Sequence, residues 1–172
     1  MVAIEHSTQR REDVEKTPYI NHPIGVAHIL WKEGGVTDLA TLQAAVLHDT
    51  VEDTQTTFDE LEKTFGEEVR SLVDEVSDDK SLPKQERKRL QIVNAPHKSH
   101  KARLIKLADK LYNLRDLTKS TPEAWSEQRV QEYYEWAAKV LRGIKGTNTS
   151  LEEAIEATLK TRGVSLYDPP EI

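Results

Sequence analysis

The stretch from residue 39 to residue 53 places one histidine and three acidic residues in a segment that is otherwise mostly apolar. Apolar residues fall on both faces of this stretch at helical spacing, which predicts a helix through the middle of a core. Asp49 and Asp53 are one helical turn apart, and so are His48 and Glu52. Burying an unpaired carboxylate is costly, so this helix needs a compensating positive charge. A divalent metal ion is the natural candidate, and without it the carboxylates should repel one another and raise at least one pKa.

The composition excludes several classes of protein. At 172 residues the chain is long enough for one well-packed domain and short for two. It has no apolar stretch long enough to span a membrane, and residues 1–20 lack the apolar centre of a signal peptide. The absence of cysteine excludes disulfides and thiolate chemistry, and we expect a cytoplasmic protein. A formal net charge of −6 argues against binding to a nucleic acid polymer.

Helix signals recur along the chain, whereas strand signals are almost absent. Thr37 or Asp38 can cap the central helix, Thr57–Glu60 forms a capping box, and Thr121-Pro122 is expected to begin a long helix. We therefore predict an all-α fold with about seven to nine helices. The expected division is one compact domain over residues 1–163 and a loose tail over residues 164–172.

Two residues far from the central helix could complete a site there. His22 precedes Pro23 at a predicted helix start, so its side chain is free to reach elsewhere, although a cap or surface position would also explain it. Asp109 lies at the rim of an apolar stripe, where pairing with Lys106 or Lys110 is the alternative. Spacing alone leaves both alternatives open.

Three ordered segments resemble the hydrolase domain of the RelA/SpoT family, which belongs to the HD superfamily of metal-dependent phosphohydrolases. They are residues 17–23 (TPYINHP), 47–54 (LHDTVEDT) and 106–115 (KLADKLYNLR). Residues 77–84 (SDDKSLPK) and 146–148 (GTN) more closely resemble the stand-alone animal members of this family. The resemblance covers nearly the whole chain.

The resemblance implies a single metal ion, normally Mn²⁺, held by the side chains of His22, His48, Asp49 and Asp109. Imidazole and carboxylate ligands without sulfur suit Mn²⁺ or Fe²⁺, with Zn²⁺ as a substitute. Four protein ligands leave about two octahedral positions for water and a phosphate oxygen. The resemblance further implies that the catalytic residues Glu52 and Asp53 orient and deprotonate the attacking water.

The family reaction removes the 3′-pyrophosphate of guanosine tetra- or pentaphosphate, and animal members are also associated with removing the 2′-phosphate of NADPH. Both substrates carry a phosphoryl group on a ribose hydroxyl, so one site could serve either. Clusters of basic residues in this acidic chain are consistent with such a substrate, although solvated helix faces would also explain them. The substrate-binding residues that the resemblance implies are Arg11, Lys84, Asn113, Arg129 and Tyr133.

The start of the chain departs from the family pattern, because only residues 1–5 precede the segment that matches it. Glu12 also stands where animal relatives carry a basic residue beside Arg11, and its carboxylate should repel a phosphate and weaken substrate binding. Three functions therefore stay open: an alarmone hydrolase, a phosphatase acting on NADPH or another nucleotide, and a nucleotide-binding module without catalysis. The sequence does not indicate an oligomeric state.

Overall fold

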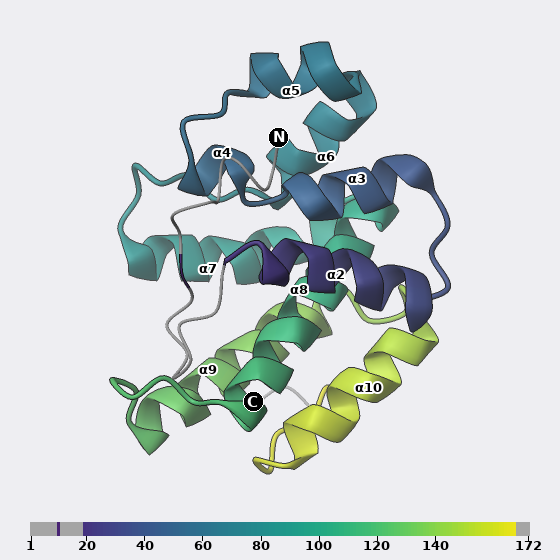
Figure 1. The fold of residues 1–172 in the computed structure, drawn as a ribbon. Coiled ribbons are helices and arrows are strands. Elements are labelled where there is room, and N and C mark those ends of the chain that lie inside the picture. Colours follow the sequence, from purple (N-terminus) through teal and green to yellow (C-terminus); the bar gives the residue numbers. More distant parts are fainter. Residues whose placement is uncertain (1–9, 11–18, 168–172) are drawn as a thin grey trace.

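The computed structural model describes residue 10 and residues 19–167, and its regular structure is helical, apart from an isolated bridge at Arg10. This confirms the predicted all-α class. The elements follow one another along the chain as shown in Figure 1. They are α2 (Asn21–Lys32), α3 (Leu39–Leu47), α4 (Thr50–Asp53), α5 (Phe58–Phe65), α6 (Glu67–Val76), α7 (Lys84–Asn94), the 3-10 turn η1 (Ala95–His97), α8 (His100–Lys119), α9 (Glu127–Arg142) and α10 (Thr149–Lys160).

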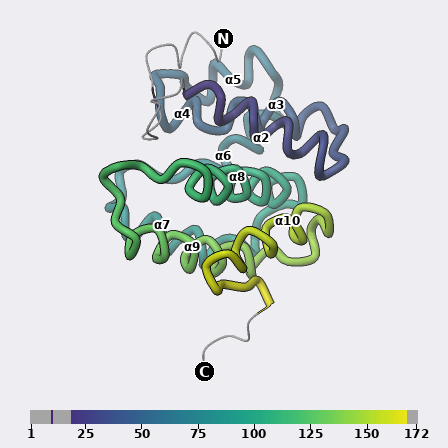
Figure 2. Tube along the Cα trace, turned by 60° about the horizontal axis from the view of Figure 1, so that its bottom comes forward, coloured from purple at the N-terminus to yellow at the C-terminus, as the bar shows by residue number. Residues whose placement is uncertain are grey.

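Helix α8 is the centre of the fold. Figure 2 shows it between α2 and α3 on one side and α7, α9 and α10 on the other, and α8 packs directly against α2, α3, α6, α9 and α10. Its apolar residues are buried on several sides, including Leu107, Leu111 and Leu114, each with no exposed surface. A helix surrounded in this way holds any polar side chain in a fixed position, because its neighbours leave little space for another rotamer.

Local capping signals set several of the helix boundaries. Asp38 caps α3 by accepting a hydrogen bond from the Thr41 amide, and Thr57 and Glu60 form the predicted capping box at the start of α5. Asn148 caps α10 in the same way as Asp38 caps α3. These side chains satisfy amide groups that a helix start otherwise leaves without partners.

The predicted central helix is interrupted, so the expectation of one continuous helix over residues 39–53 was wrong. α3 ends at Leu47 and α4 begins at Thr50, with His48 and Asp49 between them. The side chains of His48 and Thr50 contact the carbonyl oxygens of Ala45 and Leu47, which would otherwise accept amide bonds of a continuing helix. The break places His48 and Asp49 on a junction instead of a regular helix face.

Two other boundaries differ from expectation. α9 begins at Glu127 and not at Thr121-Pro122, because Ser126 is extended and its hydroxyl accepts the amide of Arg129. At the other end, Val164 and Leu166 are buried in the core, and the Leu166 amide donates to Glu156. Packing therefore continues beyond residue 163, where the sequence predicts a loose tail; residues 168–172 lie outside the described residues.

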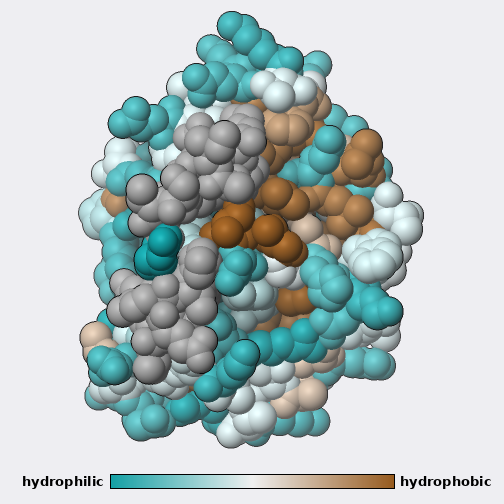
Figure 3. Space-filling view, viewed as in Figure 1, coloured by the Kyte–Doolittle hydropathy of each residue, from teal (hydrophilic) through white to brown (hydrophobic). Residues whose placement is uncertain are grey.

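One face of the molecule exposes apolar surface. Figure 3 shows apolar atoms gathered over α2 and α3, where an open groove is lined mainly by Ala27, Trp31, Leu42 and Val46. Leu42 and Val46 are only half-buried, so this side of α3 is not part of the closed core that the sequence predicts. None of the described helices is both long and apolar enough to cross a membrane.

Candidate active site

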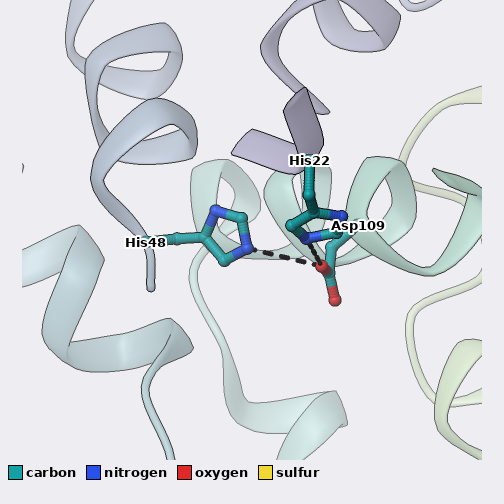
Figure 4. Close-up of side chains that lie close together, drawn as sticks. All are labelled: His22, His48 and Asp109. Atoms are coloured by element: carbon teal, nitrogen blue, oxygen red, sulfur yellow. Dashed lines mark hydrogen bonds and ion pairs between the residues drawn. The ribbon is translucent and has the colours of Figure 1, made fainter. Parts of the chain in front are cut away.

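Three separate parts of the fold bring histidine and aspartate side chains together beside α8. His22 comes from the first turn of α2, His48 and Asp49 come from the α3–α4 junction, and Asp109 comes from α8. Figure 4 shows both imidazole rings directed toward Asp109. The Nε2 atoms of His22 and His48 lie 2.9 and 3.4 Å from Asp109 Oδ1. The sequence alternatives for His22, a cap or an exposed surface position, are excluded because its side chain is buried in this cluster.

Asp49 lies against the same two histidines. Its Oδ2 is 3.1 Å from His48 Nε2 and 3.7 Å from His22 Nε2. The four side chains therefore direct two nitrogen and two oxygen atoms into one small space. The ligand atoms of His22, His48 and Asp109 all lie within 4.8 Å of one another, so these three residues could hold a divalent metal ion.

The hydrogen bonding of His48 indicates which of its nitrogens is available to a metal. Its Nδ1 contacts the carbonyl oxygen of Ala45, an acceptor, so this nitrogen carries the proton. Its Nε2 is buried and makes no hydrogen bond with the described residues. A backbone carbonyl that fixes the tautomer in this way leaves the Nε2 lone pair free to bind a cation. The donor set and this unbonded nitrogen therefore fit a divalent metal.

Without a metal, the cluster is held by opposite charges. Burial opposes protonation of His48, but Asp49 and Asp109 outweigh it and raise the pKa of the imidazole well above its usual value. Burial would raise the pKa of Asp49 and of Asp109, yet the neighbouring histidines lower the pKa of both carboxyls. A bound cation and a proton on His48 therefore compete for the same place.

Tyr19 adds a contact that the sequence analysis did not assign. Its hydroxyl donates a hydrogen bond to Asp49 Oδ2, and burial together with the charge of Asp49 raises the Tyr19 pKa far above its usual value. The hydroxyl therefore stays protonated and holds the Asp49 carboxylate in place. The only sequence signal for this role is the position of Tyr19 three residues before His22, inside the first of the matching segments.

Glu52 and Asp53 lie on the short helix α4, next to the cluster. Burial raises the pKa of Glu52 to about 7, and Asp78 and Asp49 add to the increase. Burial and Asp49 also raise the pKa of Asp53, against the opposing charge of Lys80, whose Nζ is 3.4 Å from Asp53 Oδ1. This agrees with the prediction that crowded carboxylates repel, and it gives Glu52 the proton affinity of a base that works near neutral pH.

An open, polar hollow of about 650 Å³ contains the cluster and both α4 carboxylates. Positively charged side chains also line it, from Lys80 before α7, Arg87 on α7, and Lys106 and Lys110 on α8. A hollow with carboxylates at its centre and cations on its walls suits a metal ion that is approached by an anionic ligand.

The predicted substrate residues are distributed unevenly around this hollow. Asn113 lines it, whereas Lys84 is exposed at the start of α7 and is not part of its wall. Arg129 and Tyr133 belong to a neighbouring aromatic cluster, in which the Arg129 guanidinium stacks 3.9 Å from the centre of the Trp125 ring. Tyr133 lies between Trp125 and Trp136, with ring centres 6.0 and 5.5 Å apart. Arg11 and Glu12 lie outside the described residues.

Lys110 connects the two clusters and was considered in the sequence only as a partner for Asp109. Its Nζ is 3.7 Å from Asp109 Oδ2 and 4.3 Å from the centre of the Trp136 ring. It is buried, so its charge is close to both the carboxylate and the aromatic face without much screening by water. Its sequence signal is its position one helical turn from both Leu107 and Leu114, where the apolar stripe of α8 would otherwise predict an apolar residue.

An all-helical chain with two histidines and two aspartates gathered beside a central helix has the features of a metal-binding HD domain. The family model described as "HD domain" matches residues 1–135. The chain belongs to the HD domain family.

Comparison with individual proteins identifies its near relatives. The chain is 65% identical over 164 residues to the Homo sapiens protein "Guanosine-3′,5′-bis(diphosphate) 3′-pyrophosphohydrolase MESH1", covering 95% of this chain and 92% of that one. The Xenopus tropicalis protein of the same name is 63% identical over the same shares of both chains. A solved structure of a metazoan orthologue of SpoT that hydrolyses ppGpp superimposes with a TM-score of 0.92, at 52% identity, over 94% of this chain and 91% of that one.

Proposed function

We propose that this chain is a manganese-dependent hydrolase that removes the 3′-pyrophosphate of guanosine tetra- or pentaphosphate to give GDP or GTP. The observation that carries the proposal is the placement of Glu52, whose pKa is raised to about 7, in the same hollow as His22, His48, Asp49 and Asp109. The names of the relatives supply the substrate, and the donor set of nitrogen and oxygen without sulfur supports manganese. The same donors also suit Fe²⁺, with Zn²⁺ as a substitute.

The residues divide into two groups with different tasks. His22, His48, Asp49 and Asp109 would hold the metal ion, which when bound would polarise the phosphoryl group and increase the acidity of water. Glu52 would accept a proton from the attacking water, with Asp53 beside it to orient that water. The water oxygen forms a bond to the phosphorus next to the ribose, the bond from that phosphorus to the ribose 3′-oxygen breaks, and the 3′-oxygen takes up a proton.

Cations and aromatic rings around the hollow would bind the rest of the nucleotide. Asn113 is placed for the ribose, and Arg129 with Trp125 and Tyr133 offers a charged and aromatic surface for a phosphate or a base. Lys84 and Arg11 remain predictions for additional phosphate contacts. Glu12 also remains a prediction, and its replacement by lysine should lower KM.

A hydrolysis assay with identified products tests the proposal. Purified protein with Mn²⁺ is expected to convert guanosine tetraphosphate to GDP and pyrophosphate, and the reaction should stop when EDTA is added. Separate kcat/KM values for guanosine tetraphosphate and NADPH compare the proposal with its alternative. Cleavage of NADPH alone would favour the 2′-phosphatase, and cleavage of neither substrate would favour a binding module.

A further inference from the structure

A second hollow, of about 770 Å³, adjoins the candidate active site on the side of α6 and the C-terminal half of α7. It shares part of its wall with the first hollow, namely Arg87, Gln91 and Lys106, together with Val76 and Asp78. Beyond this shared wall it is lined by Lys98, which precedes α8, and by apolar side chains of α7 and α9. The two hollows therefore lie side by side along these five shared residues.

Of the four cations that line this second hollow, Arg103 donates hydrogen bonds to the carbonyl oxygens of Lys98 and Pro96, whereas Arg87, Lys98 and Lys106 make no ion pair with the described residues. Arg87 Nε is also buried without a hydrogen bond. In contrast, Glu75 accepts bonds from the amide and hydroxyl of Ser99. The remaining two acids are also occupied, Asp78 by the Gln91 side chain and Asp79 by Ser81.

The cations extend from the candidate active site into the second hollow, because Lys106 lines both hollows and Lys98 lines only the second. Lys106 is one turn before Asp109 on α8, and its charge acts on the carboxyl of Glu52. Lys98 lies on the wall of the second hollow together with Lys106. Burial and the charge of Lys106 lower the pKa of Lys98, against the opposing charges of Glu75, Asp78 and Asp74. Two nearby ammonium groups repel each other, and an anion between them would relieve this repulsion.

We propose that Arg87, Lys98 and Lys106 form a binding site for the outer phosphate of the 3′-pyrophosphate group, and that this site selects a diphosphate over a monophosphate. The proposal rests on the proposed function for the orientation of the substrate. With the inner phosphorus at the metal-type cluster, the outer phosphate projects away from the ribose and enters the second hollow. A monophosphate ester has no outer phosphate, so it gains no contact with Lys98, the one of the three cations that lines only the second hollow.

The test is the binding of inorganic pyrophosphate to Mn²⁺-loaded protein, measured by titration calorimetry with the same Mn²⁺ concentration in both solutions. Lys98→Gln and Arg87→Gln should each weaken pyrophosphate binding by about tenfold or more, the usual effect of losing a charge-assisted hydrogen bond. Lys98→Gln should leave orthophosphate binding nearly unchanged, because Lys98 lines only the second hollow. In kinetics, both variants should raise KM for guanosine tetraphosphate, and Lys98→Gln should leave KM for NADPH the same.

The matched control is Arg89→Gln, on the same helix two residues from Arg87, where the guanidinium is exposed and paired with Glu86. It should not alter either measurement. Equal pyrophosphate affinity in wild type, Lys98→Gln and Arg87→Gln would overturn the proposal and leave these cations with the role of balancing nearby acidic residues. The calorimetric result is independent of turnover, so it decides the binding site even if the protein hydrolyses no guanosine tetraphosphate.

Discussion

At the scale of single residues, the charge problem posed by the sequence has a specific solution in the structure. His48 and Asp49 face His22 and Asp109 across a small space. The sequence could indicate that the acidic residues at 49–53 belong to a functional site, because burying several carboxylates in an apolar segment is costly without a compensating positive charge. Tyr19 could not be assigned in the same way, since its hydrogen bond to Asp49 joins residues thirty positions apart and has no signature in local spacing.

The raised pKa of Glu52 leads to a pH-dependent difference in stability. Its folded-state pKa, about 7, lies above the ordinary value of 4.5, so its protonated form favours folding and this stabilisation is lost as pH rises from about 4.5 to 7. Glu52→Gln cannot ionise. We therefore compare the free energy of unfolding of the metal-free variant with that of metal-free wild type at two pH values. The difference, variant minus wild type, should be larger at pH 8 than at pH 5 by about 1–3 kcal/mol.

Urea unfolding of both metal-free proteins at the two pH values measures this difference, and other titrating groups cancel in the comparison. Glu123→Gln, at an exposed position, is the control and should show no such change. If the free energies of unfolding of wild type and Glu52→Gln change with pH in parallel, the pKa of Glu52 is not raised in the folded protein.

At the scale of elements, capping residues predicted helix boundaries well where the cap is local. Asp38 and the Thr57–Glu60 box begin helices as expected, because each interaction lies within four residues. The break between α3 and α4 was missed, since its cause is a set of side chains that bond to carbonyls at the point where the site is built. Apolar periodicity cannot reveal a break of this kind, because it reports which residues are buried and not how the backbone turns.

Close packing of α2 on α8 fixes the position of His22 and gives a second prediction. A Cβ atom at Gly25 would lie 2.2 Å from Cε2 of Tyr112, whose ring meets the His22 ring edge-on with centres 4.8 Å apart. Gly25→Ala should therefore move Tyr112 or α2, lower stability by about 1–3 kcal/mol and weaken metal binding.

Thermal unfolding and a Mn²⁺ titration measure these two effects. Ile24→Ala is the control from the same helix, because the Ile24 side chain is 54% exposed and its loss should alter neither quantity much. If Gly25→Ala binds Mn²⁺ as tightly as wild type, the spacing between α2 and α8 does not set the geometry of His22.

At the scale of the whole molecule, the site depends on the complete arrangement of helices around α8. Residues from the start of α2, the α3–α4 junction and α8 meet there, so a bound metal would connect segments nearly ninety residues apart along the chain. The all-α class and the single metal-type cluster could be predicted from the sequence. The two adjoining hollows could not, because their walls combine residues of α6, α7 and α8 that lie far apart along the chain.

The central claim is a division of labour between metal-holding residues and a base, and one paired measurement tests it most directly. Mn²⁺ content and turnover of guanosine tetraphosphate are determined for wild type, Asp49→Ala and Glu52→Gln. Asp49→Ala should lose bound metal and activity together, and it should also lose the rise in melting temperature that Mn²⁺ gives the wild type. Glu52→Gln should retain metal and that stabilisation while kcat falls by about 10²–10⁴-fold. Near-normal turnover by Glu52→Gln, or full metal content in Asp49→Ala, would contradict the claim.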